Sequence, residues 1–227
     1  MSETKRGLYV LFEGLPPTVI DSQVLTHVRM SAETLGIEWT VLACAASDEN
    51  YQQAQARVDD AREAAQCGVS VVRAIRPVYP FSVTANRWMA GRALEKLRQI
   101  DFVHARTDYT AAVFGPLCQK FGIPMLWDCR GDGVAEFRAR VGELPFPQSL
   151  LRDWRVRRLK HDIRTAERTA DAAAFVSNEL REAVLPDESD LPSWIPPCAA
   201  PSDRFFFDPL LRSAMRAKLG YTDSDIV

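Results

Sequence analysis

The segment 127–133 holds the densest group of side chains that could take part in chemistry. It contains Asp128, Arg130, Gly131 and Asp132 within seven residues, directly after an apolar run. Carboxylates accept hydrogen bonds from sugar hydroxyls, a guanidinium binds phosphate, and glycines let the backbone approach a ligand. Turn formation with an internal Asp–Arg pair would also explain these residues. The segment is the first candidate for substrate binding.

Two further candidates lie where other apolar runs end. His104 and Arg106 leave such a run together, and both side chains can donate hydrogen bonds to hydroxyls or anions. Gly14 follows the first apolar run and could let backbone N–H groups reach a phosphate or a sugar hydroxyl at the start of the next helix. A partly buried histidine beside a helix cap, and a tight turn at Gly14, are the structural alternatives.

Other kinds of chemistry are not indicated by the sequence. It contains neither a G-x-G-x-x-G motif nor a P-loop motif, and its histidines at positions 27, 104 and 161 form no Ser-His-Asp or Cys-His arrangement. The five cysteines include no C-x-x-C pair, which predicts free thiols, no metal site and a reducing compartment. A net charge of −2 gives no reason to expect a nucleic-acid partner, and we expect no cofactor.

A regular alternation of apolar runs and longer amphipathic segments must position the candidate residues. This alternation predicts parallel β-α-β crossovers in an α/β fold, a Rossmann-like doubly wound sheet with helices on both faces. In such a sheet, ligands bind beyond the carboxyl ends of the strands, which is where the candidates lie. Strands are expected at 7–12, 38–44, 70–75, 101–106, 123–128 and 172–176, and helices at 20–35, 49–66, 82–99, 108–121, 148–170, 178–185 and 209–219.

The expected helix 148–170 carries seven basic side chains and three acidic ones. We expect an apolar stripe that includes Leu151 and Trp154 to face the core, which would leave a basic outer surface. Such a surface can attract anionic lipid head groups, although a solvated helix face is the alternative. The sequence has no signal-peptide core and no apolar stretch of membrane-spanning length, so we expect a cytoplasmic protein, with this helix as a candidate peripheral contact at the inner face of the membrane.

The last residues of the chain, 224–227, have the pattern of the first steps of another strand. We therefore expect one domain over 1–223, followed by the start of a second domain whose remainder is missing.

In this order, the segments resemble the N-terminal domain of glycosyltransferase family 4, whose members are retaining enzymes with two facing Rossmann-like domains. The opening strand, loop and long helix carry part of the similarity. The rest is carried by DFVHARTDYTAAV at 101–113, GIPMLWDCRGD at 122–132, RTAERTADAAAFVSNELREAV at 164–184, IPPCAAPSDRFFF at 195–207 and LRSAMRAKLGYTDSDIV at 211–227.

The resemblance implies transfer of a sugar from a nucleotide-sugar donor to a glycan or lipid-linked acceptor. In the family, the second domain binds most of the donor and supplies a pair of Glu residues and a basic phosphate clamp, so this chain alone is expected to be inactive. Many members place a His where this sequence has Arg130. Because arginine stays protonated near pH 7, Arg130 is expected to bind a hydroxyl or phosphate instead of acting as an acid or base. The alternative is a stand-alone Rossmann-like binding or interaction domain without catalysis.

Overall fold

The computed structural model describes residues 4–17, 19–76, 81–97, 99–196, 207–222 and 224–225. The chain divides into two compact units, Met1–Pro196 and Pro197–Val227. All candidate residues named above lie in the first unit. The expected domain boundary after residue 223 stays a prediction, and 226–227, half of the expected final strand, lie outside the described residues.

The described part of the first unit is built on one seven-stranded sheet, in which every neighbouring pair of strands is parallel. The strand order β3-β2-β1-β4-β5-β6-β7 places the first strand near the middle of the sheet. This order confirms the predicted doubly wound α/β fold. The strands are β1 (Arg6–Leu11), β2 (Glu38–Ala45), β3 (Gly68–Arg73), β4 (Phe102–Arg106), β5 (Met125–Cys129), β6 (Ala172–Phe175) and β7 (Ser193–Trp194).

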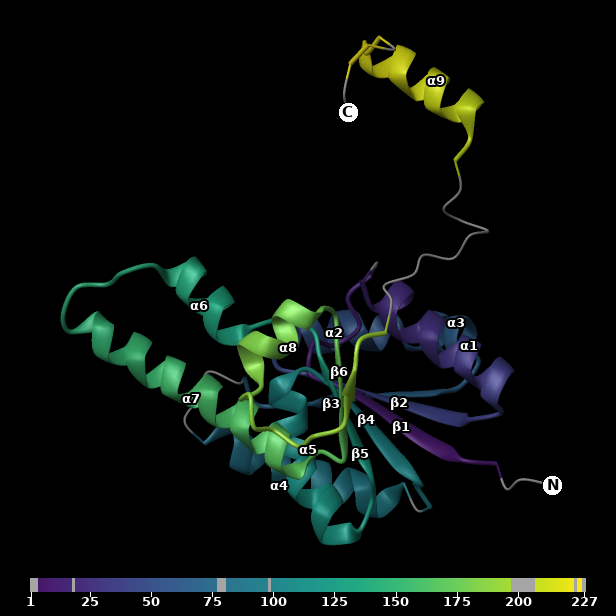
Figure 1. The fold of residues 1–227 in the computed structure, drawn as a ribbon. Helices are drawn as coiled ribbons and strands as arrows, with labels where there is room; N and C mark the ends of the chain where they lie inside the picture. Colours follow the sequence, from purple (N-terminus) through teal and green to yellow (C-terminus); the bar gives the residue numbers. More distant parts are fainter. Residues whose placement is uncertain are drawn as a thin grey trace. The chain divides into compact units, whose positions relative to one another are not determined.

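Helices cover both faces of this sheet (Figure 1). They follow the strands along the chain, as expected for β-α-β crossovers. Those of the first unit are the π-helix η1 (Asp21–Leu25), α1 (Thr26–Leu35), α2 (Asp48–Ala56), α3 (Val58–Ala65), α4 (Ser82–Lys96), α5 (Asp108–Phe121), α6 (Gly133–Val141), α7 (Gln148–Thr169) and α8 (Asn178–Val184).

The side chains of β1 alternate between two hydrophobic cores, one on each face of the sheet. Leu8 and Val10 belong to the core that includes residues of α4, α5 and α7, whereas Tyr9 and Leu11 belong to the core that includes residues of η1, α1 and α3. All four side chains are buried. A strand that is buried on both faces reads as a continuous apolar run, which is why the sequence alone located β1.

The ends of α1, α5 and α9 fall where the sequence places capping residues. Gly36 and Gly122 adopt left-handed φ values of 66° and 68° directly after α1 and α5, a conformation that glycine tolerates best. The second unit contains α9 (Pro209–Leu219), which was predicted with the same bounds. The Asp208 side chain caps its first turn, and Gly220 ends it with φ 76°.

Three helical segments differ from the prediction. The expected helix 20–35 consists of the π-helix η1 followed by α1. The expected helix 49–66 is two helices, α2 and α3, because the chain breaks at Arg57, where φ is −102° and ψ is 0°. The Arg57 guanidinium donates to the carbonyl of Leu15 at 2.5 Å and to the carboxylate of Asp21 at 2.8 Å, and so ties the break to the segment after β1. The structure also contains α6, which was not predicted.

The prediction for the buried face of α7 is partly wrong. Of the expected stripe, Leu151 and Trp154 are 72% and 36% exposed, whereas Ile163 and Ala166 are buried. The first turns of α7 pair with α6 beyond the edge of the sheet and have no sheet to pack on (Figure 1). No helix in the described part of the chain is both long and apolar enough to cross a membrane.

Candidate functional site

The strand order places a topological switch point at the carboxyl ends of β1 and β4, and we call this part of the sheet's carboxyl edge the crevice. These strands are neighbours, yet β1 continues into helices of one face and β4 continues into α5 on the other. In open α/β sheets, ligands bind where neighbouring strands diverge in this way. The candidate residues Arg106, Asp128 and Arg130 lie at or next to the ends of β4 and β5, beside this switch point.

Arg106, the last residue of β4, is buried beneath the crevice. Its Nε donates to Glu13 Oε2 at 2.7 Å, and one terminal nitrogen donates to Gln23 Oε1 at 2.8 Å. Its other terminal nitrogen lies 3.9 Å from Asp128 Oδ2 and has no aligned hydrogen-bond partner among the described residues. Arg106 therefore joins the loop after β1, the π-helix and β5.

Arg130, just after β5, reaches the same acceptor from the other side. One terminal nitrogen donates to Gln23 Oε1 at 2.8 Å, and the other lies 3.4 Å from Asp128 Oδ1. The Arg130 side chain is 23% exposed and the Arg106 side chain is 4% exposed, so of the two guanidinium groups that of Arg130 can meet a ligand. A single amide oxygen, that of Gln23, thus holds both guanidinium groups in place.

Asp128 is the buried carboxylate at the centre of this cluster. Tyr9 Oη donates to its Oδ2 at 3.3 Å, and His104 Nε2 lies 3.4 Å from the same oxygen without the alignment of a hydrogen bond. Burial alone would raise the pKa of Asp128, but the nearby His104 and the charges of Arg130 and Arg106 together lower it below its usual value. Asp128 is therefore ionised near pH 7 and acts as an acceptor.

His104 belongs to an aromatic layer below the crevice. Its ring stacks on Tyr9 with 4.2 Å between the ring centroids, and His27 lies edge-on at 5.6 Å. Burial and the neighbouring His104 lower the pKa of His27, so its ring is neutral near pH 7. The predicted site residue His104 thus lies under the crevice, packed within the protein.

Gly14, Gly131 and Asp132 have structural roles in the loops that follow the strands. The N–H of Gly14 donates to the carbonyl of Cys44 at 3.1 Å, and its φ is +71°. Asp132 Oδ1 accepts from the backbone N–H groups of Val134 and Ala135 and so caps α6. A Cβ at Gly131 would lie 2.3 Å from the end of the Glu136 side chain. These residues shape the loops around the crevice.

The charges in the crevice are balanced. Two carboxylates, Glu13 and Asp128, face two guanidinium groups, those of Arg106 and Arg130. Neither arginine can act as a base near pH 7, and the lowered pKa of Asp128 keeps it ionised there, so it has no proton to donate and is a weak base. The arrangement is thus suited to hydrogen bonding with a polar ligand. The described residues contain no cluster of His, Cys, Asp and Glu that could hold a metal ion.

Gln23, Glu13 and Tyr9 belong to the cluster but were not predicted from the sequence. Gln23 lies in η1, and π-helical turns occur often at functional sites. No sequence motif marks such a turn. Glu13 directly precedes the candidate Gly14, so its place after a strand was a usable signal.

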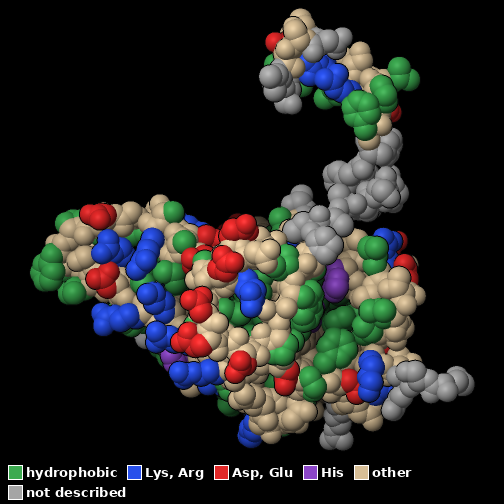
Figure 2. All heavy atoms as spheres, viewed as in Figure 1, with side chains coloured by type: hydrophobic (Ala, Val, Ile, Leu, Met, Phe, Trp, Pro, Cys, Tyr) green, Lys and Arg blue, Asp and Glu red, His purple; other side chains and the backbone are tan. Residues whose placement is uncertain are grey.

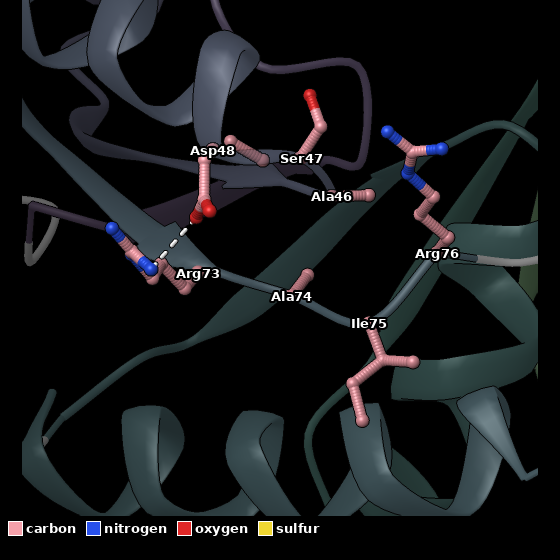
Figure 3. Close-up of a pocket in the computed structure, with 8 residues that line it drawn as sticks. Ala46, Ser47, Asp48, Arg73, Ala74, Ile75 and Arg76 are labelled. Atoms are coloured by element: carbon pink, nitrogen blue, oxygen red, sulfur yellow. Dashed lines mark ion pairs between the residues drawn. The ribbon is translucent and has the colours of Figure 1, made fainter.

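An open depression of about 380 Å³ lies on the same edge of the sheet, at the ends of β2 and β3. Figure 3 shows Ser47, Asp48, Arg73 and Arg76 around it, with an ion pair of 2.8 Å between Asp48 and Arg73. None of the predicted site residues lines this depression. It extends the polar edge of the sheet away from the crevice.

No family model and no curated protein matches this sequence. Solved structures match the fold at low identity. One is Anabaena Alr3699/HepE in complex with UDP and glucose, at 13% identity and a TM-score of 0.56, over 95% of this chain and 50% of that one. Another is the UDP-N-acetylglucosamine 2-epimerase of Rickettsia bellii, at 16% identity and a TM-score of 0.55, over 97% of this chain and 52% of that one.

A third is Arabidopsis thaliana UGT89C1 complexed with quercetin, at 12% identity and a TM-score of 0.55, over 95% of this chain and 55% of that one. The chain spans about half the length of these solved structures. At these identities the similarity concerns the fold alone, a Rossmann-like α/β domain.

Proposed function

We propose that this chain is the N-terminal, acceptor-side domain of a glycosyltransferase of the family 4 type. The transferred sugar would come from a nucleotide-sugar donor and go to a glycan or lipid-linked acceptor. One observation carries the proposal: Arg106 at the end of β4 and Arg130 just after the neighbouring β5 share the Gln23 oxygen beside Asp128 at the topological switch point. The fold similarity to proteins solved with UDP supports it.

In this proposal, Arg130 and Asp128 contact the reacting molecules. The partly exposed guanidinium of Arg130 donates to a hydroxyl or phosphate, and Asp128 accepts from a sugar hydroxyl. Arg106 and Gln23 hold these two groups, while Gly14, Gly131 and Asp132 shape the loops. Groups on a separate donor-binding domain supply the rest of the site, so this chain alone binds weakly and transfers nothing.

We also propose that the protein works in the cytoplasm at the inner face of the membrane, through the basic helix 148–170. An acceptor anchored in lipid would then be presented to the crevice from that surface.

The test measures sugar transfer by the protein in which this chain is joined to its donor-binding domain. Thermal shift first selects the donor from a panel of nucleotide sugars, since a ligand at 100 times its Kd adds about 2.7 kcal/mol of stability. Arg130→Ala is expected to lower kcat/KM by about 100-fold, the effect of losing one donor aimed at developing charge. Arg140→Ala, at an exposed site on α6, is the matched control and keeps full activity. A joined protein that neither binds nor transfers any nucleotide sugar contradicts the proposal.

A stand-alone binding or interaction domain is the second candidate. The balanced ion pairs of the crevice favour it, because the carboxylates and guanidinium groups there already pair with one another. This candidate predicts that the joined protein shows no transfer and that Arg130→Ala leaves partner binding unchanged.

A further inference from the structure

The outer end of the α6–α7 hairpin carries a group of exposed apolar side chains. We call this group the hairpin tip: Phe146, Leu150, Leu151 and Trp154, with exposed fractions of 78%, 55%, 72% and 36%. Figure 2 shows hydrophobic side chains at this end of the molecule's first unit, with Lys and Arg side chains beside them. Hydrophobic side chains gathered at one exposed end mark a surface that contacts something other than water.

Basic side chains lie on the same face of α7 as Leu150 and Trp154 of the tip, further along the helix. Leu150 and Trp154 begin a row of exposed residues spaced three or four apart, which share one side of a helix. The row continues with Arg157, His161, Arg164 and Arg168. The helix as a whole has seven basic and three acidic side chains, in a chain whose net charge is −2. Positive charge is thus concentrated on the helix that carries the tip.

We propose that this surface docks on an anionic lipid bilayer, with the hairpin tip in the interfacial region and the arginines of the row on lipid head groups. An apolar end beside a basic face matches the two layers of such a membrane, whose head groups are negative and whose interior is apolar. In this proposal, the membrane contacts both the apolar tip and the basic row of α7. A uniformly basic helix face, by contrast, would bind the membrane through charge alone.

The connection to the crevice gives docking a consequence for the acceptor, and this part rests on the proposed function. α6 begins at its cap Asp132, two residues after Arg130, and its nine residues span about 14 Å. A single helix therefore links the crevice to the tip. A lipid-linked acceptor whose head group extends from the docked membrane over this length would reach Arg130, which makes lipid-linked molecules the acceptor class of this proposal.

Co-sedimentation of the 227-residue chain with vesicles tests the proposal without any sugar donor. The chain is expected to bind vesicles that contain 30% phosphatidylglycerol and not vesicles of phosphatidylcholine alone. Binding should weaken in 0.5 M NaCl, because salt screens the charges. Failure to bind overturns docking but leaves transfer to a soluble glycan intact, and failure of the transfer assay leaves vesicle binding intact.

Two variants separate the tip from the basic row. Phe146→Glu with Leu151→Glu is expected to weaken binding at least tenfold, whereas the control Met30→Glu with Leu35→Glu, at sites 53% and 72% exposed on α1, should not change it. Arg157→Gln with Arg164→Gln should weaken binding about 25-fold, roughly fivefold for each charge.

Circular dichroism and the urea midpoint show that each variant folds. Equal binding by the tip variant and the parent overturns the proposal. The proposal is also overturned if the parent is dimeric and the tip variant is monomeric, because a second copy of the chain would then cover this surface.

Discussion

Replacing Arg106 by Met is expected to lower the free energy of unfolding by about 2–4 kcal/mol. The Arg106 side chain is 4% exposed and donates to Glu13 at 2.7 Å and to Gln23 at 2.8 Å. A hydrogen bond that involves a charged group contributes about 1.5–3 kcal/mol, and removing one member of a buried ion pair costs about 3–5 kcal/mol. Because Glu13 is 40% exposed, water can replace part of its bond, which lowers the expected loss.

Urea denaturation followed by circular dichroism measures this loss by linear extrapolation. The control is Arg62→Met, which removes an exposed pair with Asp59 at 3.0 Å and should cost no more than about 1 kcal/mol. Combining Arg106→Met with Glu13→Gln should cost less than the sum of the two single changes, since they share one bond. A loss for Arg106→Met no larger than that for Arg62→Met would refute the view that Arg106 organises the crevice.

Three further predictions concern the elements that support the site. Burial raises the pKa of Asp108 to about 6, so the stability that this carboxyl contributes below pH 4 is lost as the pH rises through 6. The free energy of unfolding of Asp108→Asn, relative to that of the parent, should therefore rise by about 1–2 kcal/mol from pH 4.5 to pH 8. Urea denaturation of both proteins at each pH measures this difference. Gly115→Ala should cost about 1–3 kcal/mol in the same assay, because its Cβ would lie 1.9 Å from the Thr169 hydroxyl, whereas Gly91→Ala, with no atom nearer than 3.8 Å, should be neutral or stabilising. Asp132→Ala should cost about 1 kcal/mol through loss of the α6 cap, and an unchanged urea midpoint would contradict that role.

For the docking surface, the sequence pattern predicted the helix but not which of its side chains are buried. The sequence indicated a basic helix at 148–170 and assigned Leu151 and Trp154 to its buried side. That assignment failed because helical periodicity defines which residues share a face but not what the face packs against. Only the structure shows that the first turns of α7 extend past the sheet with α6, which leaves these side chains exposed.

The sequence by itself determined the class of fold, because each strand buried on both faces is a continuous apolar run, and α1, α5 and α9 each end at a glycine. It also located Arg106, Asp128 and Arg130, since polar residues after parallel strands share one edge of the sheet.

Only the tertiary structure decided how these residues meet. The order of the strands brings β1 beside β4, and the π-helix then places the Gln23 amide between two guanidinium groups that lie 83 and 107 residues away along the chain. Contacts over such separations depend on strand order and helix packing, which local patterns do not specify. The tertiary structure therefore defines the crevice, while the sequence defines the residues available to it.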